Sequence, residues 1–337
     1  MAPDRATPTI HDVAAAAEVS PATVSRALSR PQLVAEATVQ RVLLAAGKLG
    51  YSPSPQARWL HTGKSNALTL VLPDITNPFF FDLIRGAQHE AAGAGYTQVL
   101  VDTEESADQE RDQLIAARNA SDGAVLGGSR LPGAALGELA AKFPLVLVNR
   151  QARGVPSVVI DTLPALTEAV DLLFRLGHRR IGYLGGPESA WFEPRRWQAI
   201  RTAAVDHGMS CRRLGSQPPT RAAGEAAAAE VAVTEETAVI TYNDLQALGL
   251  LHGLEELGVS VPDQVSIVGC DDIFGADLTK PALTTVSGAA EQAGELATRA
   301  LVDRLRTGEA PRRVNQVVPA KLIIRNSTGP SSVARRG

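Results

Sequence analysis

The stretch Thr9-Ile-His-Asp-Val-Ala-Ala-Ala-Ala-Glu-Val-Ser-Pro-Ala-Thr-Val-Ser-Arg-Ala-Leu28 decides the fold of the N-terminal region. Its first half predicts a short helix, because Thr9 suits an N-cap and Asp12, three residues later, can complete a capping box. Its second half predicts another helix, in which Ser20 is the N-cap and Pro21 takes the first helical position, where a missing N–H costs nothing. Two short helices joined by a turn of a few residues are typical of a helix-turn-helix.

A third helix is predicted from about Ala37 to Leu49, and Gly50 should end it. This pattern also fits an ordinary three-helix bundle, so the motif alone does not establish DNA binding. The following residues, 51–65, form a linker that prolines open and a glycine closes, and its centre could make one or two helical turns. We therefore divide the N-terminal region into a helix-turn-helix domain, residues 1–50, and a hinge linker, residues 51–65.

From residue 66 onward, runs of Val, Leu and Ile alternate with helical segments. Such runs predict parallel strands whose sheets are covered on both faces. The predicted strands are Leu68–Leu72, Gln98–Val101, Gly123–Leu126, Leu145–Val148, Val158–Ile160, Arg180–Leu184, Ala238–Thr241, Val265–Val268 and Thr284–Val286. The most evident helices between them are Phe80–Ala94, Leu163–Leu176, Glu193–His207, Gln246–Leu257 and Ala289–Arg306. So many strands favour an α/β body of two doubly wound lobes, residues 66–328, followed by a tail, residues 329–337.

Composition limits the class of protein. Apolar residues make up 45% and charged residues 20% of the 337 residues, which favours packed cores over disorder. Residues 1–64 carry seven basic and four acidic side chains, whereas the whole chain has a net charge of −3, so a polyanion is expected to bind the head only. Two cysteines far apart, no secretory leader and no long apolar segment predict a cytoplasmic protein without disulfides or membrane spans.

No pattern of catalytic chemistry stands out. The chain has no HExxH or CxxC spacing, and Gly185-Gly186-Pro187 is neither a GxGxxG nor a P-loop pattern. No catalytic residue, cofactor or metal site is therefore predicted, and the protein is not expected to be an enzyme.

Taken together, the motifs resemble the lactose-repressor (LacI/GalR) family of bacterial transcription regulators. The head stretch quoted above carries this resemblance, and so does a series of motifs that follow in order along the body. These motifs are Asn77-Pro78-Phe79-Phe80, Gly177-His178-Arg179-Arg180-Ile181, Asn243-Asp244, Gly269-Cys270-Asp271-Asp272 and Pro281-Ala282-Leu283-Thr284-Thr285-Val286. The resemblance implies a helix-turn-helix head and a two-lobed, periplasmic-binding-protein-like body. It further implies a repressor that binds a pseudo-palindromic, double-stranded operator as a homodimer under the control of a small-molecule effector.

By this resemblance, the helix that opens at Pro21 enters the major groove of the operator. Pro21 and Ala22 occupy base-reading positions but cannot hydrogen-bond a base, which leaves Arg26 for a polar base contact. Contact with a phosphate alone is the alternative for Arg26. Backbone-positioning contacts are expected from Ser20, Thr23 and Ser25.

The resemblance also assigns the linker a role. Leu60, with Ala57 close by, would wedge into the minor groove from a hinge helix that forms on DNA, and Arg58 would contact phosphate. Packing of Leu60 on the head is the alternative. The chain departs from the family at Ala35 and Val39, where relatives often carry a Ser and a phosphate-contacting Arg.

The expected effector site lies in the cleft between the lobes, beyond the carboxyl ends of the strands. By the resemblance it is lined by Phe79, Phe80, Asn149, Arg196, Asn243 and Asp271. An Arg and an Asp together can clasp vicinal hydroxyls, which favours a sugar or sugar derivative. A purine is disfavoured, because Ala190 stands where the purine-binding relative has an Arg. Asp271 could instead cap a helix, Trp191 could close the pocket or lie on the surface, and Asp161 is a weaker candidate.

Two other functions fit the body fold. An exported sugar-binding protein would need a leader and would lack the DNA-binding head. A global regulator controlled by a phosphoprotein would not need the ligand-binding set, so the presence of Arg196, Asn243 and Asp271 argues against it. The resemblance is compatible with an effector that releases DNA and with one that promotes DNA binding.

Overall fold

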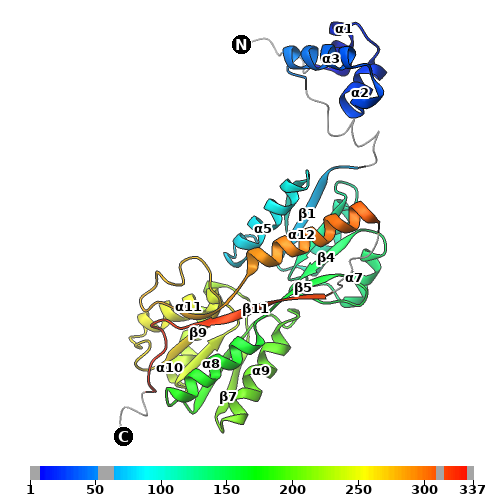
Figure 1. Cartoon of the computed structure of the whole chain (residues 1–337). Coiled ribbons are helices and arrows are strands. Elements are labelled where there is room, and N and C mark those ends of the chain that lie inside the picture. Colours follow the sequence, from blue (N-terminus) through cyan, green and yellow to red (C-terminus); the bar gives the residue numbers. More distant parts are fainter. Residues whose placement is uncertain (1–7, 52–63, 309–314, 332–337) are drawn as a thin grey trace. The chain divides into compact units, whose positions relative to one another are not determined.

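The computed structural model describes residues 8–51, 64–308 and 315–331 (Figure 1). The chain divides into two compact units, Met1–Ser65 and Asn66–Gly337, which we call the head and the body. This division falls where the sequence pattern changes from linker to strand. The predicted hinge contacts Ala57, Arg58 and Leu60 lie outside the described residues.

The head consists of short helices that local side-chain caps begin. Its elements are α1 (Ile10–Ala16), α2 (Pro21–Ser29), the 3-10 turn η1 (Pro31–Leu33) and α3 (Glu36–Leu49). The capping box of α1 is formed, because Asp12 N donates to Thr9 Oγ1 at 3.4 Å and Thr9 N donates to Asp12 Oδ2 at 2.8 Å. Ser20 Oγ accepts from Thr23 N at 3.2 Å and starts α2. The predicted three-helix head is therefore confirmed, with η1 as an unpredicted addition.

The core of the head takes one fully buried valine from each helix, namely Val13, Val24 and Val42, with alanines around them. Small side chains allow the helices to approach closely. Gly50 ends α3 with φ 66°, a left-handed conformation in which Cβ would be strained.

The N-cap of α3 gives a prediction for the stability of the head. Ala35 occupies this cap and makes no side-chain hydrogen bond, whereas the caps of α1 and α2 do. Ala35→Ser is therefore expected to stabilise the head by about 0.5–1 kcal/mol. Hydrogen exchange of head amides in the full chain measures this change. Ala15→Ser, at an exposed helical position, is the control and should slightly destabilise the head. Equal destabilisation by both variants would contradict the capping argument.

The body contains an eleven-stranded sheet in the order β2-β1-β3-β4-β5-β11-β10-β9-β8-β6-β7. Every neighbouring pair is parallel except β10 and β11. The strands are β1 (Ala67–Leu72), β2 (Thr97–Asp102), β3 (Gly123–Gly127), β4 (Leu145–Val148), β5 (Ser157–Asp161), β6 (Arg180–Gly185), β7 (Ser210–Ser216), β8 (Ala238–Thr241), β9 (Ser266–Asp271), β10 (Thr284–Gly288) and β11 (Asn315–Ile323).

Two of these strands were not predicted. β11 joins the two halves of the sheet, because Asn315–Pro319 pairs with β5 and Ala320–Ile323 pairs with β10. Pro319 lacks an N–H and argues against a central strand, but here it lies where the strand changes partner. β7 is a polar edge strand in which only Leu214 is buried, so it shows no apolar run.

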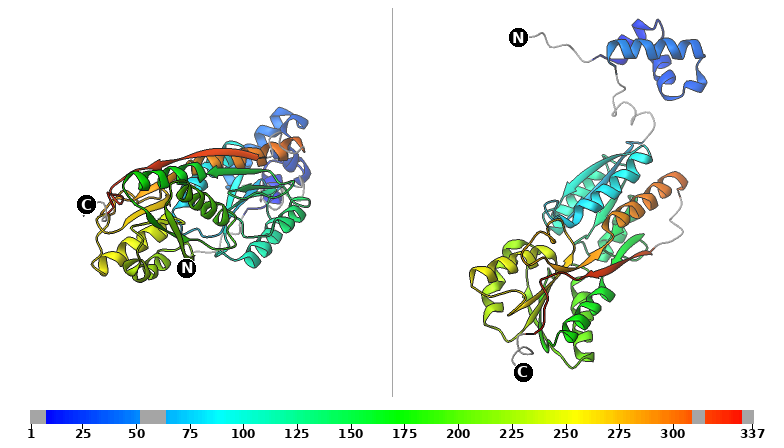
Figure 2. Two further views of the ribbon diagram at one scale, coloured as in Figure 1. Left: turned by 90° about the horizontal axis from the view of Figure 1, so that it is seen from below. Right: turned by 60° about the vertical axis from the view of Figure 1, so that its left-hand side comes forward.

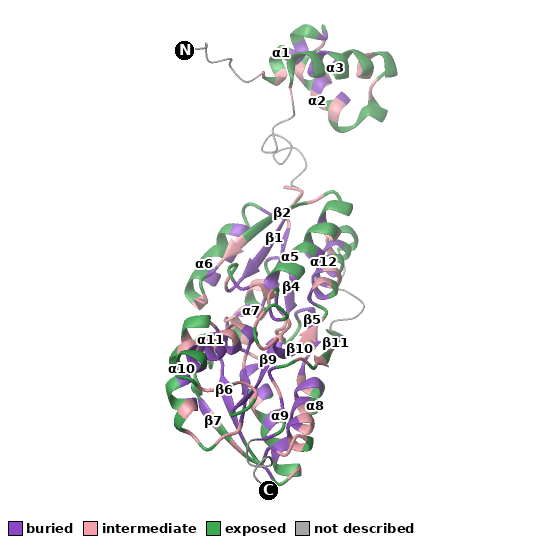
Figure 3. Ribbon diagram, turned by 90° about the vertical axis from the view of Figure 1, so that its left-hand side faces the viewer, coloured by how far each residue is buried: buried purple, intermediate pink, exposed green. Residues whose placement is uncertain are grey.

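Helices cover both faces of each half of the sheet (Figures 1 and 2), which makes two lobes. In the near lobe, which holds β1–β5, α5 (Phe79–Gly93) and α12 (Ala290–Thr307) cover one face, and α6 (Ala107–Ala117) and α7 (Gly133–Ala140) cover the other. The far lobe holds β6–β10. Its one face is covered by α8 (Leu163–Arg175) and α9 (Glu193–Asp206), and its other face is covered by α10 (Arg221–Val233) and α11 (Asp244–Glu256). Figure 3 shows the buried strands between exposed helix faces. The predicted fold class is confirmed.

The packed chain extends beyond the predicted boundary at residue 328. Gly329 O accepts from His178 Nε2 at 3.1 Å, and Ser331 is buried. The first three residues of the predicted tail therefore belong to the body. Among the described residues, no helix is both long and apolar enough to cross a membrane.

Candidate functional site

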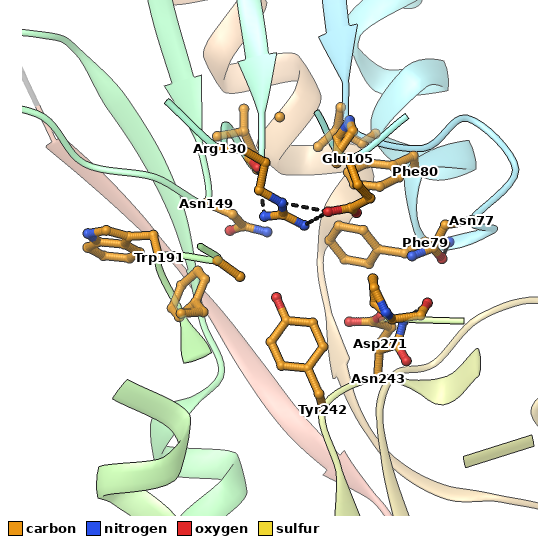
Figure 4. Close-up of a pocket in the computed structure, with 18 of the residues that line it drawn as sticks. Asn77, Phe79, Phe80, Glu105, Arg130, Asn149, Trp191, Tyr242, Asn243 and Asp271 are labelled. Atoms are coloured by element: carbon orange, nitrogen blue, oxygen red, sulfur yellow. Dashed lines mark hydrogen bonds and ion pairs between the residues drawn. The ribbon is translucent and has the colours of Figure 1, made fainter. Parts of the chain in front are cut away.

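A pocket lies between the lobes, where the loops after the carboxyl ends of their strands face one another (Figure 4). This is the expected binding position in doubly wound sheets. The six residues expected to bind an effector all line it, namely Phe79, Phe80, Asn149, Arg196, Asn243 and Asp271. The structure therefore brings together side chains that are widely separated along the chain.

Arg196 is a buried cation on the first turns of α9. Its Nη1 donates to Tyr242 O at 2.5 Å, and its Cζ lies 4.7 Å from the centroid of the Tyr242 ring. Its Nε is buried without a hydrogen-bond partner among the described residues. A buried donor without a partner is rare in proteins, so this atom is available to a ligand in the pocket.

Asp271 provides the acidic group of the far lobe. It ends β9 with φ 137°, in a region that side-chain-bearing residues rarely adopt, and such strain often marks functional positions. Burial raises the pKa of its carboxyl well above the usual range, the positive charge of Arg196 opposes this rise, and the charge of Asp244 adds to it. The carboxyl group lies at the pocket (Figure 4), where it can hydrogen-bond a hydroxyl group.

Asn243 lines the pocket, but the fold already engages its polar atoms. Its Oδ1 accepts from Gln246 N at 3.0 Å as the N-cap of α11, and its Nδ2 donates to Pro219 O at 3.0 Å just before α10. Asn243 therefore holds the starts of two helices at the pocket, and its predicted contact with an effector remains a prediction.

The near lobe provides one amide and two aromatic rings. Asn149 has φ 55°, and its Oδ1 accepts from Ile160 N at 2.9 Å, so its Nδ2 is the group left for a ligand. Phe79 is half-buried at the pocket wall, whereas Phe80 packs mainly into the core of the near lobe. The two rings meet edge to face at 5.0 Å between centroids.

The near lobe also holds an ion pair that was not predicted from the sequence. Arg130 Nε and Nη2 both lie 2.6 Å from Glu105 Oε2, and Arg130 Nη1 donates to Gly128 O at 2.9 Å. Glu105 adopts a left-handed φ of 61°. Both residues follow the carboxyl end of a predicted strand by a few positions, so the strand-end rule could have found them. Tyr242, also missed, directly follows β8.

A buried network places Arg196. Glu193 Oε2 accepts from Tyr183 OH at 2.8 Å and from Gly186 N at 2.9 Å, and Glu193 Oε1 pairs with Arg213 Nη2 at 2.6 Å. These bonds fix the first turn of α9 and the turn after β6 to the sheet. Because Arg196 is three residues after Glu193, the network sets where its guanidinium lies.

Two weaker candidates, Asp161 and Trp191, differ in where they lie. Asp161 does not line the pocket, and its Oδ1 accepts from Leu163 N at 3.2 Å, so its side chain supports the turn that leads into α8. Trp191 lines the pocket, and its ring stacks under Arg195 with 3.7 Å from Cζ to the ring centroid.

On the head, α2 presents the residues that the resemblance assigns to DNA. Ala22 and Arg26 are exposed and lie four residues apart, so they share one face of the helix. Pro21, Thr23 and Ser25 are half-buried. The Ser20 hydroxyl also lies 2.9 Å from Thr23 Oγ1, so these two side chains support the helix start.

The head and the body each match a known protein family. Residues 9–54 match the model described as bacterial regulatory proteins, lacI family, and residues 170–328 match a periplasmic binding protein-like domain. The HTH-type transcriptional repressor CytR of Escherichia coli (strain K12) is 35% identical over 329 residues, covering 95% of this chain and 96% of the repressor.

Two solved structures with ligands are also similar. The transcriptional regulator CelR in complex with cellobiose has a TM-score of 0.70 and 28% identity, covering 95% of this chain and 99% of that one. A LacI family transcriptional regulator from Enterococcus faecium with bound ribose has a TM-score of 0.71 and 26% identity, covering 78% of this chain and 99% of that one.

A capped helix-turn-helix followed by a two-lobed body with an interlobe pocket defines a ligand-responsive class of transcription regulator. The chain belongs to the lacI family of bacterial regulatory proteins. It is a DNA-binding transcriptional regulator and not an enzyme, as the sequence predicted.

Proposed function

We propose that this protein is a repressor that binds a pseudo-palindromic operator as a homodimer, and that a sugar or sugar derivative in the interlobe pocket controls its operator affinity. The observation that carries this proposal is the arrangement of charged and amide groups from both lobes around one pocket. Arg196 and Asp271 come from the far lobe, and Asn149 and the Glu105–Arg130 pair come from the near lobe.

The chemistry of the lining favours a polyhydroxylated ligand. Each hydroxyl group can donate to a carboxylate and accept from a guanidinium or amide N–H, and this set offers both kinds of partner. Phe79 and Trp191 add aromatic faces that suit the C–H face of a sugar ring. Ala190, also in the lining, offers no side-chain polar atom to a purine. The cellobiose and ribose bound by the two similar structures support the same ligand class.

Control of DNA binding follows because the groups that line the pocket come from both lobes. A ligand that contacts both lobes favours the lobe arrangement in which those contacts form together. If that arrangement also changes how two heads are held, effector binding and operator binding are coupled reciprocally. Either release or retention of the operator is compatible with this coupling.

Exposed apolar surface supports pairing of two bodies. β2 is an edge strand, and a groove beside it is lined by Ile84, Tyr96 and Leu100 among others. On the far lobe, Phe274 is 82% exposed and Leu278 is 69% exposed. Large exposed apolar side chains mark interaction surfaces, and a two-fold pair of bodies matches a two-fold operator. We further propose that Leu60 wedges into the central base step of the operator with Ala57 close by, and that Arg58 contacts phosphate. We therefore expect the protein to act in the cytoplasm, where the chromosome lies.

The experiment that tests the function combines two measurements on the purified full chain. Selection from random duplex DNA should enrich a palindromic site, and sedimentation should show a dimer on that site. A thermal-shift screen of sugars, sugar phosphates and nucleosides should find a sugar that raises the unfolding temperature and changes operator affinity. Lack of preference for any palindrome, with or without candidate ligands, would reject the proposal.

Arg26 gives a sharper prediction for the head. Arg26→Ala is expected to weaken binding to the selected operator by about 1–3 kcal/mol if the guanidinium contacts a base edge. Binding to random duplex should then change far less. Arg30→Ala removes the same charge from the exposed end of α2 and is the matched control. Equal losses on both DNAs, with a salt slope reduced by about one, would show a phosphate contact instead.

A further inference from the structure

We propose that the outer surface of the far lobe binds a transition-metal ion of the zinc class between α10 and α11. Glu225 comes from α10, and His252 and Glu256 come from α11. One ligand atom from each of the three side chains lies within 4.8 Å of the other two. No metal site is predicted here from the sequence, because the three residues form no known motif. The cluster lies outside the interlobe pocket, so this inference does not depend on the proposed effector.

The pair on α11 is already near metal-binding geometry. His252 and Glu256 are four residues apart and therefore lie on one face of the helix. His252 Nε2 and Glu256 Oε1 are 3.6 Å apart. Two ligands of a tetrahedral zinc ion, with bonds of about 2.0–2.1 Å, are roughly 3.3 Å apart, so this pair needs only a small side-chain movement.

The third ligand is held at a fixed distance because the two helices touch through their backbones. A Cβ on Gly253 would lie 2.9 Å from Glu225 O and 2.7 Å from Ala228 Cβ. Ligand-bearing backbones that cannot separate leave only side-chain rotamers to be ordered on binding, which lowers the entropic cost.

Exposure and charge at the site also suit an ion. The side chains of His252, Glu256 and Glu225 are 41%, 63% and 41% exposed, so an ion can reach them and water can complete its coordination. Two carboxylates attract a divalent cation, and the imidazole favours zinc-class ions over magnesium or calcium. Arg221 Nη2 lies 3.8 Å from Glu225 Oε2, a loose ion pair that a bound metal can replace.

A bound ion would tie α10 to α11. Both helices begin at the interlobe pocket, since α11 is capped by Asn243 and α10 follows Pro219. Zinc should therefore raise the unfolding temperature of the full chain, because an ion that binds only the folded protein stabilises it.

Calorimetric titration of the chelator-stripped full chain with Zn²⁺ tests the inference, and absorption of the Co²⁺ form reports the ligand set. We expect one Zn²⁺ per chain at this site, a loss of that site in His252→Ala and at least tenfold weaker binding in Glu256→Gln. Glu255→Gln makes the same change at the next exposed residue of α11, and His89→Ala removes an exposed histidine that lies 3.9 Å from a single carboxylate. Both controls should bind Zn²⁺ like the wild type.

Two results would overturn the inference. One is a wild-type chain that takes up no Zn²⁺. The other is a titration in which His252→Ala and Glu256→Gln bind Zn²⁺ with unchanged stoichiometry and affinity, which would place the ion elsewhere. Excess Mg²⁺ is then added as a competitor. If Mg²⁺ displaced Zn²⁺, the carboxylates alone would hold the ion, which would contradict the role given to His252. Circular dichroism of each variant verifies that it folds.

Discussion

Arg196→Ala is expected to abolish the response of operator binding to the effector while operator binding without effector stays intact. The substitution removes the donor to Tyr242 O and the buried cation that opposes the charge of Asp271. The loss of a hydrogen bond from a charged donor costs about 1.5–3 kcal/mol. We therefore expect effector affinity to fall by about tenfold or more.

The measurement is a titration of the selected operator with and without the sugar found in the thermal-shift screen. Arg195→Ala is the matched control, because it removes the same side chain from the next residue of α9. Arg195 is exposed, stacks on Trp191 and does not line the pocket. Loss of an exposed cation–π contact is worth about 0.5–1 kcal/mol, so this variant should keep its response. Weaker operator binding by Arg196→Ala without effector, together with lower stability, would indicate a structural role instead.

Gly249→Ala is expected to have the largest effect on stability. A Cβ at residue 249 would lie 1.9 Å from Arg221 O and 2.8 Å from Glu225 N, which are backbone atoms of α10. Neither atom can rotate away, so α10 and α11 would have to separate along their contact. Overpacking of a tight core costs about 1–3 kcal/mol and sometimes more, and contact between two backbones belongs at the upper end.

Thermal or urea unfolding of the full chain, followed by circular dichroism, measures this loss. Gly137→Ala is the control, because Gly137 also lies inside a helix of the body, and among the described residues the new Cβ would meet only Arg153 O, at an ordinary 3.8 Å. Alanine at that position should stabilise the body by up to about 1 kcal/mol. If Gly249→Ala were as stable as the wild type, the close contact between α10 and α11 would be wrong.

Arg196→Ala and Gly249→Ala both bear on the wall of the interlobe pocket. Asn243 begins α11 at the pocket, and Gly249 and Gly253 set the distance between α11 and α10. A shift of α11 in Gly249→Ala would therefore change the pocket wall as well as stability. Arg196→Ala, in contrast, should change binding with little movement of the helices. Comparison of the two variants separates the ligand contacts of the pocket from the packing that holds it.

The sequence by itself determined the first two helices of the head, because the caps that begin them are local. Thr9 and Asp12, and likewise Ser20 and Thr23, are three residues apart, and their caps form within one turn of chain. It also determined the alternation of strands and helices in the body, since runs of buried Val, Leu and Ile reveal the central strands. It did not reveal β7, which is a polar edge strand, or β11, which contains Pro319.

Only the tertiary structure decided which polar side chains meet. Glu105 and Arg130 belong to loops after different strands and form an ion pair only because β2 and β3 lie on either side of β1. The Glu225, His252 and Glu256 cluster similarly requires the contact between α10 and α11. The physical reason is range: caps and apolar periodicity act within a few residues, whereas pairing across strands, helices and lobes depends on the packing of the whole body.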